Sequence, residues 1–269
     1  MGKAIWSEIG LRSVAYVFSA LILLPLFLII TVSFTRTSYI TFPPRGFTLE
    51  WYGAALKNPR LIEALRVSLQ VGILSAMLAT AMGVIGAVFL SKAKGWIAKS
   101  ATALYLSPIT VPIIVLSIGL LFFLTRLGLV RSVTGLVIGH TVITFPYCVR
   151  VIGASLGRSL EQLERAAAVL GAGPLQVFVR VTLPSIRAGI VAALLFAFLI
   201  SLNNVTIALF LAGARTQTLP LLMLQYTKDQ VTPDIAALAS LLVVVTFGVM
   251  IALERRFGMY QLFERTAKA

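Results

Sequence analysis

Long stretches without a charged residue alternate with short charged segments along the whole chain. Six of these stretches hold at least 18 consecutive uncharged residues, and the next longest holds 14. A hydrocarbon core of about 30 Å needs roughly 20 apolar residues in helical conformation. The pattern predicts an all-α integral membrane protein, a single transmembrane domain over residues 1–269. Its six helices are expected at residues 14–34, 67–91, 100–125, 132–149, 188–212 and 235–253.

Composition agrees with this pattern, because 59% of the residues are apolar and only 12% are charged. Soluble domains contain about 25% charged residues, and disordered chains contain few apolar ones. Both classes are therefore excluded. The first apolar stretch, Val14 to Phe34, is longer than the roughly 7–15 residues of a signal-peptide core. It is expected to remain as a membrane helix.

An even number of helices places both termini on the same side of the membrane. With the termini inside, 14 of the 23 Lys and Arg residues lie in cytoplasmic segments, as the positive-inside rule favours. The net charge of +14 is therefore assigned to helix ends that meet anionic headgroups. Nucleic acid is not an expected partner, because basic side chains with interleaved aromatics are missing.

The segment between the fourth and fifth predicted helices, residues 153–185, is much longer than a connection requires. Ser159 and Gln162 have the spacing of a capping box, which predicts a helix over 160–170. Its apolar stripe would hold four side chains: Leu160, Leu163, Ala167 and Leu170. An ion pair between Glu161 and Arg165 is expected one turn apart.

Glycine and proline divide this cytoplasmic segment into two helical pieces. Gly171 is placed to end the first helix, and Gly173-Pro174 prevents its continuation. A second helical stretch over 175–182 is expected to stop before Pro184. The segment therefore predicts a helix, a glycine break and a second short helix outside the membrane.

The run from Leu163 to Gly171, followed by Leu183-Pro184, resembles the E-A-A-x3-G-x9-I-x-L-P loop of binding-protein-dependent ABC importer permeases. In that family the loop couples the permease to its ATPase. The resemblance assigns this role to nine residues: Leu163, Glu164, Arg165, Ala166, Ala167, Gly171, Pro174, Leu183 and Pro184. Two positions depart from the motif: Arg165 replaces its glutamate, and Val181 replaces its isoleucine.

Other segments are similar to the spermidine/putrescine-type permeases, specifically to their second, C-type subunit. They include Pro108 to Gly119, Phe145-Pro146 and the stretch from Leu219-Pro220 to Pro233. The resemblance implies a permease in a bacterial inner membrane that forms half of a path for a small polar solute, such as a polyamine or related amine, an opine or a phosphonate. Implied partners are two ATPase subunits, a related second permease and a substrate-binding protein.

Polar residues interrupt the fifth apolar stretch near its middle. Asn203 and Asn204 follow Ser201 at the place where this group commonly carries two acids. Buried polar groups at membrane depth usually face the bundle interior or a water-filled path. The three side chains are therefore expected to line the translocation path, with hydrogen bonding between helices as the alternative. Because both amides are neutral, the resemblance does not establish a polyamine as the solute.

Catalytic and metal sites are not expected. Gly153 to Gly157 matches the G-x-S-x-G nucleophile pattern, but the single histidine, His140, precedes it. One cysteine, Cys148, provides neither a disulfide nor a cysteine metal cluster. The sequence contains no G-x4-G-K-[ST] motif, so ATP and Mg²⁺ are expected on a partner ATPase. A self-contained carrier or an intramembrane enzyme remains the alternative, although buried carboxylates for ion coupling are missing.

Overall fold

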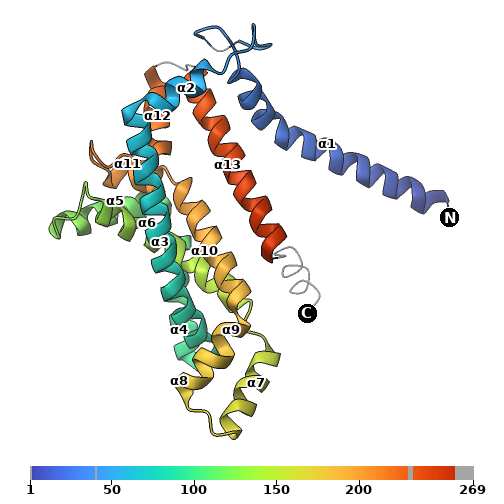
Figure 1. Ribbon diagram of the computed structural model, residues 1–269. Coiled ribbons are helices and arrows are strands. Elements are labelled where there is room, and N and C mark those ends of the chain that lie inside the picture. The colour runs from blue at the N-terminus through green and yellow to red at the C-terminus, as the bar shows by residue number, and fades with distance from the viewer. Residues whose placement is uncertain (1, 40, 230–232, 258–269) are drawn as a thin grey trace. The chain divides into compact units, whose positions relative to one another are not determined.

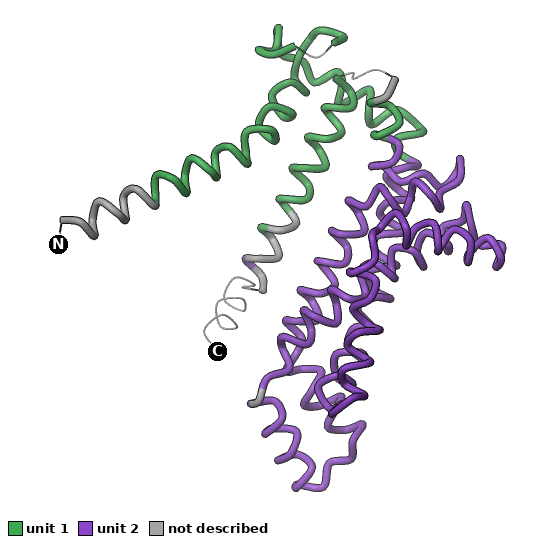
Figure 2. Tube along the Cα trace, turned by 180° about the vertical axis from the view of Figure 1, so that it is seen from behind, with its two compact units in different colours: residues 1–62, 223–251 green, residues 63–222, 252–269 purple. Residues whose placement is uncertain are grey.

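The computed structural model describes residues 2–39, 41–229 and 233–257, and no β-strand occurs among them. The chain divides into two compact units, one of residues 1–62 and 223–251 and the other of residues 63–222 and 252–269 (Figure 2). The observed elements confirm the all-α class.

The first unit contains α1 (Gly2–Val32), α2 (Glu50–Lys57), most of α12 (Leu219–Asp229) and the greater part of α13 (Pro233–Phe257). Helix α2 is labelled in Figure 1, and several polar contacts of this unit involve its residues. The Tyr52 hydroxyl lies 2.7 Å from both Ser33 Oγ and Ser240 Oγ, and Trp51 Nε1 donates to the Thr35 carbonyl. The aromatic segment after the first span therefore forms a short ordered helix.

The second unit is built around three long helices: most of α3 (Pro59–Lys92), α6 (Val133–Gly153) and α10 (Arg187–Leu202). Ser132 begins α6, because its hydroxyl accepts a hydrogen bond from the Gly135 amide. Small residues let these helices approach closely. A Cβ on Gly83 would lie 2.6 Å from Cys148 Cβ, and one on Gly139 would meet α11 (Thr206–Leu211).

Two apolar clusters follow one another along α3 in the second unit. One contains Val67, Val71, Leu136 and Leu211, and the other contains mostly small residues of α3, α6 and α10. Many large apolar side chains on the outside of the helices are exposed, for example Ile85 at 69% and Phe122 at 69%. Such surfaces are stable in lipid rather than in water.

The expected spans are only partly continuous. Within the described part of the chain, three helices are long and apolar enough to cross a membrane, and five spans result if each of two bent helix pairs counts as one. The predicted helix 100–125 is wrong as a continuous span. It consists of α4 (Gly95–Thr110) and α5 (Ile113–Arg126), bent by 101°. Pro112 lacks a donor and forces Val111 into an extended conformation, with ψ 132°.

The predicted helix 188–212 also breaks, because α10 ends at Leu202 and α11 begins at Thr206. The predicted helix 235–253 lies inside α13, which runs from Pro233 to Phe257. The other three predicted spans lie inside α1, α3 and α6, apart from the last residues of the first and the first residue of the fourth.

Candidate functional site: a helical segment outside the spans and a polar cavity within them

The segment outside the spans begins with α7 (Arg158–Val169). Gly157 precedes it without a side-chain cap, so the capping box expected from Ser159 is wrong. The helix begins one residue before Ser159, which is therefore already inside it. At the other end Gly171 has φ +87°, and the amides of Gly171 and Ala172 bond to carbonyls of the last turn. This is a Schellman ending, as the glycine predicted.

Helix α7 presents one narrow face to the rest of its unit. Leu160 is buried, and Glu164 and Ala167 are half-buried. The stripe expected from the sequence is therefore partly wrong, because Leu163 and Leu170 are 55% and 88% exposed. Leu160 and Glu164 share one face of the helix. Leu163 lies to one side of that face, so its side chain points outward.

Glu164 and Arg165 lie next to each other in the motif but have different roles in the structure. Glu164 points inward, where its carboxylate accepts from the Thr182 hydroxyl and lies 3.4 Å from Lys92 Nζ at the end of α3. Arg165 points outward and pairs with Glu161, as predicted. Glu164 therefore connects α7 both to a membrane helix and to the second half of the segment.

The second half contains α8 (Pro174–Val177), the π-helical turn η1 (Phe178–Thr182) and α9 (Leu183–Ser185). The expected stop before Pro184 is wrong, because the helical backbone continues to Ser185. The wider turn accommodates the proline: the Leu183 amide bonds to the Phe178 carbonyl five residues earlier. Pro174 occupies a first-turn position, where its missing donor costs nothing.

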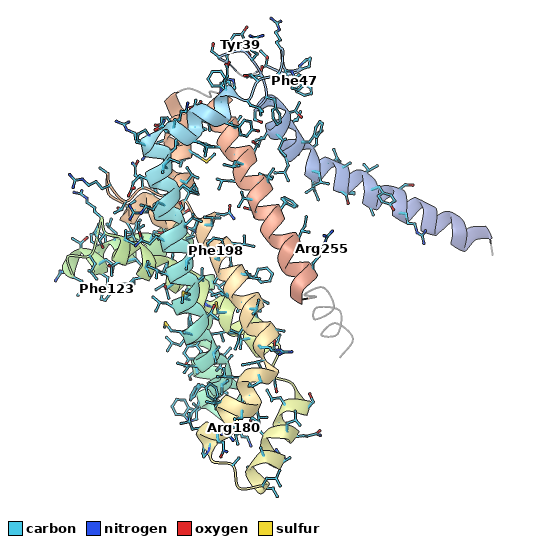
Figure 3. All side chains as sticks on the ribbon, viewed as in Figure 1. Tyr39, Phe47, Phe123, Arg180, Phe198 and Arg255 are labelled. Atoms are coloured by element: carbon cyan, nitrogen blue, oxygen red, sulfur yellow. The ribbon has the colours of Figure 1, made fainter. Side chains whose placement is uncertain are left out.

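This segment carries an exposed apolar surface at its far end. Leu163, Val169, Leu170 and Leu175 are 55%, 87%, 88% and 76% exposed. Ala166 is exposed beside them, and Arg180 extends from η1 at the same end of the unit (Figure 3). Apolar side chains on a helix outside the membrane are stable when another surface covers them.

A second group of polar residues lies inside the membrane-spanning part of the same unit. His140 Nδ1 and Ser201 Oγ are joined by a 2.7 Å hydrogen bond, and Ser75 Oγ donates to Ser201 at 3.0 Å. All three side chains are buried, and they join α6, α10 and α3. His140 Nε2 has no partner among the described residues. The sequence singled out Ser201 and His140 separately but missed Ser75, since serines are scattered along the spans.

The two asparagines after α10 differ in their surroundings. Asn203 is exposed, and its amide donates to the Leu199 carbonyl of its own helix at 2.9 Å. Asn204 is half-buried, and its Oδ1 accepts from the Ile207 amide at the start of α11. The pair therefore occupies the break between α10 and α11, with Asn204 capping the second piece.

Both helix breaks open into one cavity of about 380 Å³. Pro108, Thr110 and Pro112 line it from the α4–α5 break, and Asn204 lines it from the α10–α11 break. Tyr147 of α6 is also part of the wall. The lining contains hydroxyl and amide groups but no charged side chain, so it suits neutral hydrogen bonding. Of the three residues predicted for a path, the structure places Asn204 in this wall, Asn203 beside it and Ser201 in the buried cluster.

The G-x-S-x-G pattern lies at the turn after α6, where a Cβ on Gly189 would lie 2.1 Å from Ser155 Oγ. The ring of His140 bonds to Ser201 and not to Ser155. The described residues include no group of three His, Cys, Asp or Glu side chains that could hold a metal ion.

Residues 79–258 match the family described as binding-protein-dependent transport system inner membrane component. The chain belongs to this family. The match includes α6, the whole segment 153–185 and both asparagines. This protein is therefore a multi-pass permease subunit of an ABC importer, and the family is not itself catalytic.

Two curated relatives extend the comparison to most of the chain. The spermidine/putrescine transport system permease protein PotC of Haemophilus influenzae is 26% identical, over 88% of this chain and 91% of its own. The molybdenum transport system permease protein ModB of Mycobacterium bovis is 32% identical, over 76% of this chain and 83% of its own. The resemblance to the spermidine/putrescine-type permeases is thus confirmed.

A solved structure shows the same fold. It is a bacterial alginate ABC transporter in complex with a periplasmic protein bound to an alginate pentasaccharide. Its matching chain has a TM-score of 0.70 at 17% identity, with 94% of each chain covered. At this identity the likeness establishes the permease fold and leaves the solute open.

Proposed function

We propose that the chain forms one half of the translocation path of an ATP-driven importer in a bacterial inner membrane. Its six spans would be α1, α3, the α4–α5 pair, α6, the α10–α11 pair and α13. Both termini would be cytoplasmic, which the distribution of Lys and Arg supports. The breaks in the third and fifth spans fit this function, since discontinuous helices commonly line transporter sites.

Residues 153–185, the coupling segment, are the surface to which an ATPase subunit would bind. Support comes from the exposed apolar side chains of Leu163, Val169, Leu170 and Leu175, which need a covering surface. Leu163, Arg165 and Ala166 would touch the ATPase directly, because all three are exposed. Gly171, Pro174, Leu183 and Pro184 would shape the segment. Glu164 and Ala167 would hold it to its own unit.

The contact that carries this proposal is the Glu164 carboxylate, which joins Lys92 of α3 to Thr182 of the coupling segment. A push on α7 would therefore reach a membrane helix and the start of α10 together. A two-state gate that responds to a ligand on another subunit needs such a rigid connection. ATP and Mg²⁺ would be held by two partner ATPase subunits.

The solute path would pass the cavity at the two helix breaks, lined by Asn204, beside Asn203 and Ser201. The cavity wall has no charged side chain, so this half of the path favours a small polar solute and supplies no counter-charge for a polyamine. One relative is named for spermidine and putrescine and the other for molybdenum. A separate binding protein would deliver the solute, and a related second permease would complete the path.

Purification and reconstitution test the proposal. Extracted in mild detergent, the chain should co-purify with an ATPase and a second permease. Liposomes that hold the whole complex should take up solute only with ATP and the binding protein. The second candidate, an ion-driven carrier, requires that the chain alone transport solute in liposomes under an ion gradient, and that result would overturn the importer.

A further inference from the structure

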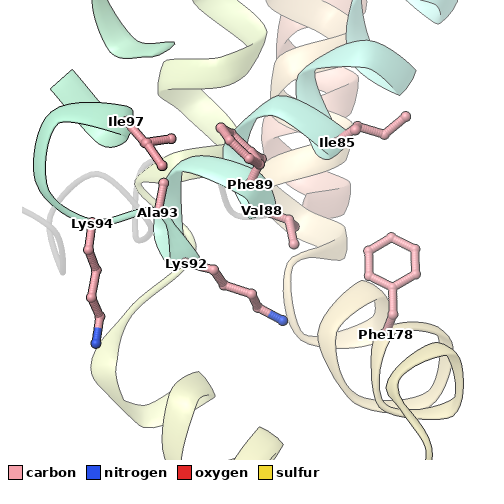
Figure 4. A pocket seen from close by; sticks show the side chains of 8 residues that line it. All are labelled: Ile85, Val88, Phe89, Lys92, Ala93, Lys94, Ile97 and Phe178. Atoms are coloured by element: carbon pink, nitrogen blue, oxygen red, sulfur yellow. The ribbon is translucent and has the colours of Figure 1, made fainter. Parts of the chain in front are cut away.

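A groove of about 680 Å³ lies at the turn between α3 and α4, beside the coupling segment. Its walls are apolar: Ile85 and Phe89 come from α3, Ile97 from α4, and Phe178 from η1 on the opposite side (Figure 4). Ile85 and Ile97 are 69% and 48% exposed. The groove therefore presents its apolar side chains to whatever surrounds the end of α3.

Two lysines stand at the mouth of this groove. Lys92 and Lys94 both line it and extend from the turn, away from the apolar side chains of α3 (Figure 4). Lys92 shares its charge with Glu164. Lys94 is exposed and has no ion pair or hydrogen bond to any residue that the structure describes. One ammonium group at the mouth is thus available to an anion.

The groove lies where the membrane surface meets the hydrocarbon. Helix α3 is long and apolar enough to span the membrane and ends at Lys92. Trp96, 76% exposed at the start of α4, is the residue type that concentrates at the level of the headgroups. Apolar walls therefore face acyl chains, while the lysines lie at the depth of lipid phosphates.

We infer that the groove binds one anionic phospholipid, with an acyl chain against Ile85, Phe89, Ile97 and Phe178 and the phosphate at Lys94. Basic pockets between spans attract anionic headgroups of the cytoplasmic leaflet. A peptide segment fits less well, because its backbone amides would meet walls without hydrogen-bonding groups. The assignment to the cytoplasmic leaflet rests on the proposed function. A lipid bound here would touch Phe178 and so contact the coupling segment.

Photolabelling of the intact complex tests the inference. The complex is reconstituted with phosphatidylglycerol or with phosphatidylcholine that carries a photoreactive group on its acyl chain, and labelled peptides are mapped. Phosphatidylglycerol should label residues 85–97 and the stretch around Phe178 about fivefold more than phosphatidylcholine. Lys94→Gln should remove that preference, since a lysine near the surface contributes a free energy equal to roughly a fivefold difference.

Matched variants separate the groove from general surface charge. Lys99→Gln removes a lysine of α4 that lies outside the groove and should leave the preference unchanged. Ala93→Phe should fill the groove and end labelling, whereas Ala103→Phe, on an exposed position of α4, should not.

Equal labelling by the two lipids, or labelling unaffected by Lys94→Gln, would overturn the inference. The inference would also be overturned if a partner subunit covered the groove and protected it from labelling. Labelling is scored independently of uptake, so a complex that labels as expected but fails to import solute would refute the proposed function and leave the lipid site standing.

Discussion

Two kinds of position in this protein tolerate few other residues. One has a backbone conformation that most residues avoid, and the other buries a polar atom that needs a hydrogen-bond partner. Gly171 has φ +87°, and a Cβ there would meet nothing within 4 Å. Glycine is therefore needed at this position because of the backbone conformation, and not because a side chain would lack space. Ser201 and His140 are constrained differently, because each buries a polar atom that needs the other.

Gly171→Val should weaken ATPase binding without affecting membrane insertion. A β-branched residue in the left-handed region costs roughly 1–2 kcal/mol, which would distort the end of α7. Gly171→Asn is the matched control, because asparagine tolerates this region, and it should retain most binding. Co-purification of the ATPase provides the measurement. Equal retention by both variants would contradict the conformational explanation.

Removing one partner of the buried polar group should destabilise the second unit. Ser201→Ala leaves His140 Nδ1 without its hydrogen bond, a loss of about 0.6–2 kcal/mol between membrane helices. The double variant Ser201→Ala with His140→Leu should cost less than the sum of the two single changes. Unfolding of the purified protein in mixed micelles measures all three. Strict additivity would show that the two side chains do not depend on each other.

At the scale of elements, the two broken spans and the coupling segment define the molecule. Pro112 ends α4, and Asn204 begins α11, so both breaks have a local cause. Their meeting at one cavity does not follow from either cause alone. Within the segment from Arg158 to Ser185, the carboxylate of Glu164 forms the ion pair to Lys92 at the end of α3.

Asn204→Leu should reduce uptake at least tenfold while the complex still assembles, because it removes both the amide in the cavity and the cap of α11. The cap is worth about 1 kcal/mol. Asn204→Ser keeps a capping oxygen, so it should restore stability but only part of the uptake. Full uptake by the serine variant would show that Asn204 acts only as the cap of α11 and not in the solute path. Normal uptake in Asn203→Leu combined with Asn204→Leu would remove both from the path.

Exchange of the charges at Lys92 and Glu164 tests the connection between α7 and α3. Glu164→Lys alone should place two cations together and uncouple ATP hydrolysis from uptake. Lys92→Glu in the same chain should recover part of the coupling, because the partly exposed pair is worth about 0–1 kcal/mol. The ratio of solute taken up to ATP hydrolysed is the measurement. A double variant as uncoupled as Glu164→Lys would argue against the pair.

At the scale of the whole molecule, the candidate functional features lie in one continuous part of the chain. The polar cavity, the buried polar group and the coupling segment all belong to residues 63–222, the continuous part of the second unit. Residues 79–258, which match the permease family, cover the cavity, the coupling segment and all of the buried polar group except Ser75. The apolar clusters of α3, α6 and α10 form without α7, apart from Leu160.

Deletion of residues 160–171 should therefore leave membrane insertion intact and abolish ATPase association. The deleted helix lies outside the spans, and it carries most of the exposed apolar surface that needs a partner. Protease protection of the membrane domain and co-purification of the ATPase measure the two effects separately. Recruitment of the ATPase by the shortened chain would place the docking surface elsewhere.

The three spans in α1, α3 and α6, the two helical pieces of the coupling segment and the glycine that ends α7 could be predicted from the order of residues, because charge spacing and local turn chemistry act over short distances. The helix predicted over residues 160–170 is observed as α7. Of the four side chains predicted to be buried, only Leu160 and Ala167 are buried or half-buried. Which side chains of an amphipathic helix are buried depends on the surface it meets, and the local pattern leaves a choice of neighbours.

The remaining features depend on residues far apart in the chain. Ser75 joins His140 and Ser201 because three helices bring them to one depth, and a lone serine in an apolar stretch has no local signal. The meeting of two helix breaks at one cavity, the inward turn of Glu164 towards Lys92 and the groove behind Lys94 arise in the same way. Helix periodicity determines which side chains each segment can bury. The packing of segments against one another determines which partner each polar group meets.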